Sequence, residues 1–275
     1  MKKLMALLLA LVMVMSLAAC GEQKTNENKG DAASGDATPP AEITYAVEAG
    51  SAGEEVAQAN GFKTVAVGSQ ANALMEVDAG TADAAIIDLL MAGAMVGEGT
   101  SYPDLKVTEQ KLNSELYGVG CRKGSDLTSF INSVMSAAYA DGTMVELAKT
   151  YGVQESLLEQ PACEFTAAES DSDVQYIQDK GKLIVGITEF APMDYQDANG
   201  QWIGFDADMA KLVAEKLGVE IEFIVIDWNN KIMELDSKNI DVVWNGMTLT
   251  DEVTSSMECT NPYVNNAQVV VTKAQ

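Results

Sequence analysis

The sequence predicts an α/β fold built as two similar lobes. From residue 41 onward, short apolar runs alternate with segments that have the periodicity of amphipathic helices, a pattern typical of largely parallel sheets covered by helices. The phrase Met-Glu-(Val/Leu)-Asp-x-x-x-x-Asp occurs at residues 75–83 and again at 233–241. With 275 residues, of which 47% are hydrophobic and 21% charged, the chain is long enough for two ordinary domains.

The first half contains one set of these elements. Strands are expected at 43–47, 64–67 and 83–88, and the second of the two intervening helices at 70–79. The first helix is expected to begin at Ser51, because Ser51 and Glu54 have the spacing of a capping box. This order of strands and helices predicts a βαβ arrangement.

The second half contains a second set of strands and helices. Strands are expected at 182–187, 220–226, 240–244 and 267–272, with a helix around 229–237. Between the first two of these strands, an apolar stripe indicates a helix that ends before Gly218. The stripe consists of Phe205, Met209, Leu212 and Val213.

The repeated phrase has a structural interpretation. In each copy, a helix would pack its Met-Glu-Val or Met-Glu-Leu face on a sheet, turn, and lead into a buried strand that begins at Asp83 or Asp241. We therefore interpret both aspartates as structural. Two ordinary βαβ units that agree by chance are the alternative. In a two-lobed α/β protein, a ligand is expected where the strand ends meet in the crevice between the lobes.

Residues 1–20 have the features of an export signal: two lysines, an apolar run too short to span a bilayer comfortably, and small residues before Cys20. The ending Leu-Ala-Ala-Cys resembles the bacterial lipobox, which implies that Cys20 becomes the lipid-bearing first residue of the mature protein. An ordinary secretory signal is the alternative. Residues 21–40 have almost no large apolar side chains and are expected to form a flexible tether.

Composition excludes several kinds of chemistry. There are 41 acidic and 17 basic residues, a formal charge of −24, so nucleic acid and anionic lipid are not expected as partners, whereas a cationic ligand is compatible with this charge. The sequence has no histidine, which removes Ser-His and Cys-His nucleophile pairs and His-based zinc sites. It has no Gly-rich phosphate loop either. We expect no catalytic residue, no metal and no cofactor.

Several longer segments carry a resemblance to a known family. In the second half these are KLIVGITEFAPMDYQDANGQWIGFDADMAKLVAEKLG (182–218), DWNNKIMELDSKNIDVVWNGMTLTDE (227–252) and NPY (261–263). They resemble the first lobe of the amino-acid-type solute-binding proteins of ABC importers. The segments AVEAGSAGEE (46–55), ALMEVDAGTADAAIID (73–88) and ELYGVGCRKGSDL (115–127) resemble the second lobe of the same family, and AYADGTMVELAKTYG (138–152) resembles its C-terminal helices.

The resemblance implies a type II periplasmic-binding-protein clamshell with a ligand cleft between its lobes. The lobes come in reverse order, as in a circular permutant. The implied parts are a lipoprotein signal (1–20), a tether (21–40), a second-lobe-like α/β domain (41–120), C-terminal-type helices that pack on the first lobe (121–160), a joining loop (161–173) and a first-lobe-like α/β domain (174–275). With the new termini at a hinge strand, we expect a single covalent crossing between the lobes, near residues 117–122.

The resemblance also implies an amine site. Asp88 matches the family's amino-group ligand, and Gly246 matches a position whose carbonyl helps to hold the amine. Phe190 and Trp228 match aromatic positions that sandwich the apolar part of the ligand. Each has an ordinary alternative, a solvated strand-end carboxylate for Asp88 and core packing for either ring.

The implied contacts to a ligand carboxylate are less complete. Thr248 matches a carboxylate-contacting position, and Ser51 with Ala52 lies where a helix N-terminus can accept an anion, unless Ser51 acts only as a cap. Val253, however, stands where the family has an arginine, and valine cannot form a fork of charged hydrogen bonds. The sole arginine is Arg122, in the hinge motif.

Two ways to complete the site stay open. Lys231 or backbone amides could compensate for the missing arginine. Otherwise the ligand is an amine or amide without an α-carboxylate, which Glu189 would suit.

The resemblance implies a lipid-anchored extracytoplasmic protein, monomeric and not an enzyme. It would capture a small polar amino acid or related amine and present it to an ABC permease in the membrane. Two alternatives stay open. One is an enzyme on the same scaffold, a dehydratase or lyase with Glu189 as general acid or base. The other is a sensory module that signals to a partner.

Overall fold

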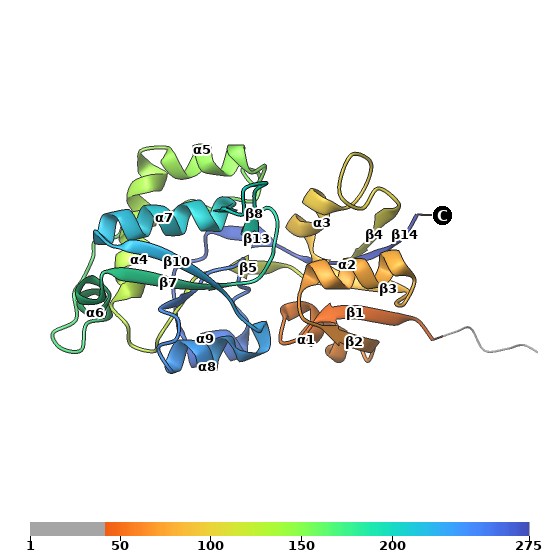
Figure 1. Ribbon diagram of the computed structural model, residues 1–275, viewed down its shortest axis with the longest axis horizontal. Helices are drawn as coiled ribbons and strands as arrows, with labels where there is room; N and C mark the ends of the chain where they lie inside the picture. Colours follow the sequence, from red (N-terminus) through yellow and green to blue (C-terminus); the bar gives the residue numbers. More distant parts are fainter. Residues whose placement is uncertain (1–41, 275) are drawn as a thin grey trace, which may run out of the picture. The chain divides into compact units, whose positions relative to one another are not determined.

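The computed structural model describes residues 42–274, in which two five-stranded sheets each carry helices (Figure 1). The export signal, the lipidation site Cys20 and the tether lie outside the described residues. We call the part around the first sheet the N-lobe and the part around the second sheet the C-lobe.

The N-lobe sheet has the strand order β2-β1-β3-β14-β4. Its strands are β1 (Thr44–Glu48), β2 (Lys63–Val67), β3 (Ala84–Asp88), β4 (Leu105–Lys111) and β14 (Gln268–Lys273), and its helices are α1 (Ala52–Ala59), α2 (Gln70–Ala79) and α3 (Leu89–Met95). Strands β2, β1 and β3 are parallel, whereas β14 is antiparallel to β3 and β4. All five residues of β3 are buried, as expected for a strand at the centre of a covered sheet.

The C-lobe sheet repeats this plan in the order β10-β7-β11-β6-β12. Its strands are β6 (Gly120–Cys121), β7 (Lys182–Ile187), β10 (Glu220–Val225), β11 (Val242–Val243) and β12 (Glu258–Cys259). Its helices are α4 (Leu127–Ala140), α5 (Thr143–Thr150), α6 (Asp173–Lys180), α7 (Phe205–Leu217), the 3₁₀ turn η1 (Trp228–Asn230), α8 (Lys231–Asp236) and α9 (Asp251–Ser256). A small ribbon pairs β8 (Tyr195–Gln196) with β9 (Trp202–Ile203). Again the first three strands are parallel and the fourth is antiparallel.

Helix α7 forms where the apolar stripe predicts it. Phe205, Met209 and Val213 are fully buried, and the helix ends at Gly218, whose left-handed backbone (φ of 75°) suits a residue without a side chain. Helices α4 and α5, from the segment predicted as C-terminal-type helices, pack against α7.

The chain crosses between the lobes twice, so the prediction of a single crossing is wrong. One crossing is β5 (Glu115–Tyr117) and the other is β13 (Val264–Asn266), and the two pair as an antiparallel ribbon (Figure 1). After β13 the chain enters β14, which lies in the N-lobe sheet. The predicted domain 174–275 therefore ends too late, because its last strand belongs to the other lobe. An apolar run predicts a buried strand without saying which sheet it joins.

The two copies of the repeated phrase occupy equivalent places. Asp83 accepts a hydrogen bond from the backbone N–H of Thr44 (2.8 Å), and Asp241 accepts one from the backbone N–H of Ile184 (2.8 Å). Each aspartate thus ties the start of a strand to the neighbouring strand, as the structural interpretation predicts. The predicted packing of the methionines is wrong, because Met75 and Met233 are 57% and 58% exposed.

Among residues 42–274, no helix has the length and apolar content needed to cross a membrane. The same residues contain no group of three or more acidic or cysteine side chains arranged to hold a metal ion. Cys121, Cys163 and Cys259 are all free thiols.

Candidate functional site

A cavity lies between the lobes, at the carboxyl ends of the parallel strands. Its space for a water-sized sphere is about 20 Å³, little more than one water molecule needs. The lining residues are Glu48, Gly50, Ser51, Ala52, Glu55, Gln70, Asp88, Phe190, Trp228, Lys231, Asn245, Gly246, Met247, Thr248, Thr250, Glu252 and Val253. Both lobes contribute, so any guest larger than water requires the lobes to move apart for entry.

The lobes touch at the edge of this cavity. The Lys231 Nζ of the C-lobe donates a hydrogen bond to the carbonyl of Gly50 in the N-lobe (2.8 Å). A Cβ atom on Gly50 would lie 2.7 Å from the Cα of Asn229, so the close approach requires glycine. The described conformation is therefore closed.

Seven of the eight predicted ligand residues line this cavity. They are Ser51, Ala52, Asp88, Phe190, Trp228, Gly246 and Thr248. Glu189 does not: its side chain is exposed, and it accepts a hydrogen bond from the backbone N–H of Gln196 (3.4 Å). The prediction that Glu189 faces the ligand is wrong, because Thr188 and Phe190, its neighbours on either side, are the buried residues here.

Asp88 ends β3 at the floor of the cavity and is 3% exposed. Its carboxylate accepts hydrogen bonds from the Tyr117 hydroxyl (2.8 Å) and the Gln268 amide (3.0 Å), and also from the amides of Gln70 and Asn266. All of these donors are neutral. Burial raises the pKa of Asp88, and the nearby Glu115 carboxylate raises it further. A ligand cation beside Asp88 would stabilise its charged form and so oppose both causes of the raised pKa.

Glu115, which the sequence reasoning missed, shares the donors of Asp88. Its Oε2 accepts hydrogen bonds from the Asn266 and Gln268 amides (3.0 Å each) and from the Thr248 hydroxyl (3.1 Å). Since Glu115 and Asn266 belong to the two crossing strands, the floor of the cavity is bonded directly to the hinge. The Thr248 hydroxyl is occupied by this bond, so it is not free to donate to a ligand carboxylate.

The two predicted aromatic residues face the same cavity. Phe190 is 2% and Trp228 6% exposed. Gly246 lies against Phe190: its φ is 55°, and a Cβ atom there would lie 2.5 Å from the ring. The backbone N–H of Gly246 donates to Asp206 (2.6 Å), a buried carboxyl whose pKa is raised by burial. The glycine thus fixes the ring and the backbone of this wall together.

Ser51 acts as the cap of α1. Its hydroxyl accepts a hydrogen bond from the backbone N–H of Glu54 (3.2 Å), while the Glu54 carboxylate accepts one from the backbone N–H of Gly50 (2.7 Å). The hydroxyl therefore accepts its bond from the helix, and the backbone N–H of Ser51 donates to the carbonyl of Glu48 (3.2 Å), which leaves the backbone N–H of Ala52 as the unassigned donor of this pair.

The most informative residue that sequence reasoning missed is Glu48. It ends β1 one strand away from Asp88, is 3% exposed, and its Oε1 accepts no hydrogen bond from any residue that the structure describes. Burial, followed by repulsion from Asp88, raises the pKa of Glu48 to about 8. The position was detectable, because the carboxyl ends of neighbouring parallel strands meet at one edge of a sheet.

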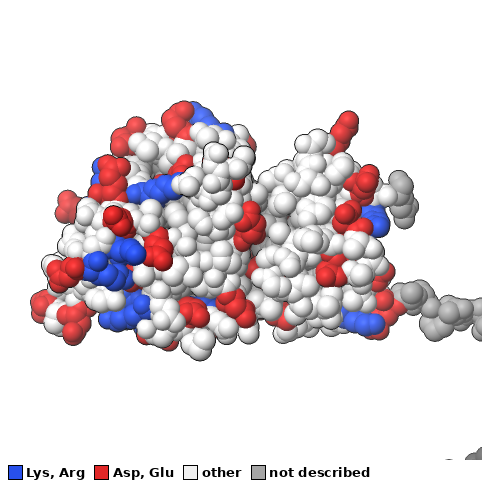
Figure 2. Space-filling view, viewed as in Figure 1, with Lys and Arg blue, Asp and Glu red and all other residues white. Residues whose placement is uncertain are grey.

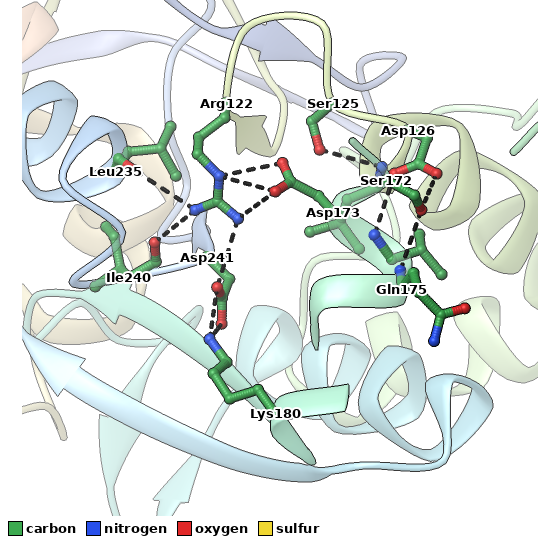
Figure 3. Close-up of polar contacts among 12 residues, drawn as sticks. Arg122, Ser125, Asp126, Ser172, Asp173, Gln175, Lys180, Leu235, Ile240 and Asp241 are labelled. Carbon is green, nitrogen blue, oxygen red and sulfur yellow. Dashed lines mark hydrogen bonds and ion pairs between the residues drawn. The ribbon is translucent and has the colours of Figure 1, made fainter. Parts of the chain in front are cut away.

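The sole arginine is not among the residues that line the cavity. Figure 3 shows it between Asp173 and Asp241. Arg122 donates to both oxygens of Asp173 (2.9 to 3.1 Å) and to the carbonyl of Ile240 (2.9 Å), and its guanidinium lies 3.5 Å from Asp241. Asp241 is also paired with Lys180 (2.6 Å). The arginine therefore holds α6 to the C-lobe sheet. Val253 does line the cavity and is 3% exposed, so a valine occupies the wall where the resemblance implied an arginine.

The charge of the molecule is visible on its surface. Figure 2 shows acidic side chains in separate groups on both parts of the face in view, whereas most of the fewer basic side chains gather on the left, around α6, α7, β7 and β10. The lining of the cavity is acidic as well, with four carboxylates and one lysine.

Residues 183–275 match the family described as bacterial extracellular solute-binding proteins, family 3. The similarity to that family is confined to this segment. The match leaves residues 1–182 outside it. The family 3 segment supplies the C-lobe wall of the cavity, including Phe190, Trp228 and Gly246, whereas Asp88 and Glu48 come from outside the matched residues.

Individual relatives match over a similar length. L-cystine-binding protein TcyJ of Escherichia coli (strain K12) is 33% identical over 99 residues, 35% of this chain and 37% of that protein. Cyclohexadienyl dehydratase of Pseudomonas aeruginosa is 26% identical over 103 residues, 37% of this chain and 38% of that protein. Among solved structures, a point mutant of the arginine-bound form of domain 1 from TmArgBP is 32% identical over 36% of this chain and 84% of that one, with a TM-score of 0.33. The chain spans less than two fifths of the length of these curated relatives.

Proposed function

We propose that this protein is an extracytoplasmic solute-binding protein that captures a small amino acid or related amine in its interlobe cavity for an ABC importer. The observation that carries the proposal is the convergence of Asp88, Phe190 and Trp228 on one cavity from two lobes. An ammonium group removed from water needs a carboxylate, and the adjoining carbon atoms need an apolar surface. The cavity offers both within a closable cleft.

Capture follows from the contacts between the lobes. In the open state the ligand ammonium reaches Asp88, whose charged form it stabilises. Closure then brings Phe190 and Trp228 of the C-lobe against the ligand and forms the Lys231 to Gly50 hydrogen bond. The permease would distinguish the closed from the open protein, since only the closed form places the surfaces of both lobes in one arrangement.

We also propose that Cys20 carries lipid and anchors the protein to the outer side of the cytoplasmic membrane as a monomer. A Cys20→Ala variant should then appear in the culture medium instead of the membrane fraction. Retention of this variant in the membrane would contradict the lipid anchor without affecting the binding proposal.

A second candidate, an enzyme on this scaffold, is favoured by one observation. Glu48 is a buried carboxyl in the interlobe cavity with a pKa of about 8, so it can hold a proton at neutral pH, as a general acid must. Proton NMR of each stabilising compound after a day with the protein separates the two candidates. Unchanged compound supports binding, and conversion to a product supports catalysis.

The binding proposal is tested by a thermal-shift panel of amino acids, their amides and short amines on the whole protein. A ligand bound only by the folded state raises the melting temperature, and at 100 times its Kd it stabilises by about 2.7 kcal/mol. Asp88→Asn should weaken binding of the best compound roughly 10-fold to 100-fold, since it removes a charge-assisted contact of about 1.5–3 kcal/mol.

Asp83→Asn is the matched control for Asp88→Asn. Asp83 directly precedes β3, at the opposite end from Asp88, and accepts a hydrogen bond from the backbone N–H of Thr44 outside the cavity. Its substitution should therefore leave ligand affinity unchanged. Equal affinities of wild type and Asp88→Asn would refute the assignment of Asp88.

A further inference from the structure

The carboxylates of the cavity lie at two depths. Glu48 and Asp88 are 3% exposed and end neighbouring strands of the N-lobe. Glu55 and Glu252 are exposed at the rim, on α1 of the N-lobe and α9 of the C-lobe. Closing the cleft therefore brings like charges together across the rim, and burial together with Glu252 raises the pKa of Glu55.

Glu48 lines the cavity with one carboxyl oxygen left without a partner in the described part of the chain, although the side chains of Thr188 and Gln70 lie close enough to lower its pKa. Its Oε1 is buried and has no hydrogen-bond donor among residues 42–274. Asp88, by contrast, accepts bonds from four side chains. A buried acceptor without a partner is costly, and an N–H donor on a ligand would remove that cost.

The cavity has no free cation for a ligand carboxylate. Lys231, the one basic residue that lines it, donates to the Gly50 carbonyl (2.8 Å), and its Nζ lies 5.2 Å from the centre of the Trp228 ring. Burial lowers the pKa of Lys231, and the carboxylates that oppose this effect include Glu252, Glu48 and Glu55. Its charge is thus already surrounded by negative groups, and the neighbouring Val253 offers only methyl groups.

We propose that the ligand is a small organic dication without a carboxylate, with one basic nitrogen held by Glu48 and Asp88 and the second held at the rim by Glu55 and Glu252. This inference rests on the proposed binding function and narrows its ligand class. The rings of Phe190 and Trp228 contact the carbon chain between the two nitrogens. The cavity lining has four carboxylates and one lysine, and a ligand with two positive charges offsets this negative surplus. An amino acid offsets it less, because it brings another carboxylate into the cavity.

Proton release should accompany binding. The groups that face Glu48 are Asp88 on β3, Lys231 on α8, Thr188 after β7 and Gln70 on α2. In the empty cavity Glu48 is largely neutral at pH 7, because its pKa is about 8. A ligand cation favours the charged form, so Glu48 transfers its proton to the buffer and affinity rises as the pH increases toward 8.

The test is titration calorimetry of the whole protein at pH 7 with compounds that differ only by a carboxylate. The pairs are 1,4-diaminobutane with ornithine, 1,5-diaminopentane with lysine, and agmatine with arginine. In at least one pair the amine should bind at least tenfold more tightly than its amino acid. Butylamine, which has a single nitrogen, should bind at least tenfold more weakly than 1,4-diaminobutane.

The outcomes separate this inference from the proposed function. If the amino acids bind more tightly than their amines, or if only neutral amino acids bind, the dication inference is wrong and the proposed function stands. If no amine or amino acid binds, both are wrong.

Glu48→Gln provides a second test with the same side-chain size. It should weaken binding of 1,4-diaminobutane at least tenfold and reduce the difference in binding heat between phosphate and Tris buffers, which reports the released protons, to the part that Asp88 contributes. The control is Glu109→Gln, on the exposed face of β4, which should change neither quantity. Unchanged proton release in Glu48→Gln would overturn the role of Glu48.

Discussion

At the scale of single residues, burial keeps Glu48 neutral in the folded protein over a pH range in which the unfolded chain is charged. The ordinary pKa of 4.5 rises to about 8. Below pH 4.5 the group is protonated in both states, and between pH 4.5 and 8 only the unfolded state loses the proton. The free energy of unfolding therefore falls as the pH rises through this window. Burial also raises the pKa values of Asp88, Asp194 and Asp206, which act in the same direction.

We predict that the ligand-free protein is more stable at pH 5 than at pH 8. In Glu48→Gln this difference in stability should shrink. At pH 8 the free energy of unfolding of the variant should exceed that of wild type by about 2 kcal/mol or more, since one pKa unit corresponds to about 1.4 kcal/mol. Urea denaturation at both pH values measures it. Parallel pH dependence in the two proteins would show that Glu48 is not buried in its neutral form.

The residue types of the site were more predictable than their surroundings. Asp88, Phe190 and Trp228 could be placed on the cavity because family motifs and strand ends identify them. The place of Glu48 at the same sheet edge as Asp88 was detectable from the strand ends, but its burial was not, since no sequence feature distinguishes a buried strand-end carboxylate from an exposed one. Glu189 was misplaced by a single residue along the chain, because alternate side chains of an extended segment point in opposite directions.

At the scale of elements, the segment between β11 and α9 depends on Gly246. A Cβ atom there would clash with Phe190, and its φ of 55° disfavours any other residue. Gly200 provides the matched control, because its φ is 76° and nothing lies within 4 Å of its Cβ position.

We predict that Gly246→Ala destabilises the protein by about 1–3 kcal/mol more than Gly200→Ala does, and that it weakens ligand binding by moving the Phe190 ring. Thermal denaturation and titration of both variants measure the two effects. Equal destabilisation of Gly246→Ala and Gly200→Ala would mean that both lose stability only through backbone strain, and that the Phe190 ring does not pack tightly against Gly246.

Another element-scale prediction concerns α6, which Arg122 joins to the C-lobe sheet (Figure 3). Arg122→Met leaves Asp173 buried without its cation, so it should cost about 3–5 kcal/mol in the free energy of unfolding. Lys149→Met, which removes an exposed ion pair with Glu146, should cost less than about 1 kcal/mol. Ligand affinity at a temperature where both variants are folded should equal that of wild type, and a loss in Arg122→Met would place the arginine in the ligand site after all.

At the scale of the whole molecule, two chain crossings and one polar contact control closure. Because β5 and β13 both cross, two covalent connections join the lobes instead of the predicted one. The Lys231 to Gly50 hydrogen bond, by contrast, exists only when the lobes are closed. The order of the lobes relative to the family, a circular permutation, stays a prediction.

We predict that Lys231→Met shifts the ligand-free protein toward the open state about tenfold or more, since a hydrogen bond to a charged group contributes about 1.5–3 kcal/mol. Its radius of gyration in small-angle X-ray scattering should exceed that of Lys182→Met, whose lysine pairs with Glu222 within the C-lobe. Identical scattering from the two variants would show that this contact does not hold the lobes together.

Much of the architecture was predictable because periodicity and the repeated phrase report local structure: the parallel strands, α7 and its end at Gly218 lie where expected. The number of crossings was not predictable. Pairing of β14 with β3 and β4 depends on contacts between segments more than 150 residues apart, and the apolar sequence of β14 would fit either sheet.

The most direct test of capture between the lobes is a crystal structure with the compound that stabilises the protein most in the thermal-shift panel. We predict a ligand nitrogen within about 3 Å of the Asp88 or Glu48 carboxylate, with carbon atoms against Phe190 and Trp228. A ligand bound outside this cavity, or one with its carboxylate turned toward Asp88, would contradict it.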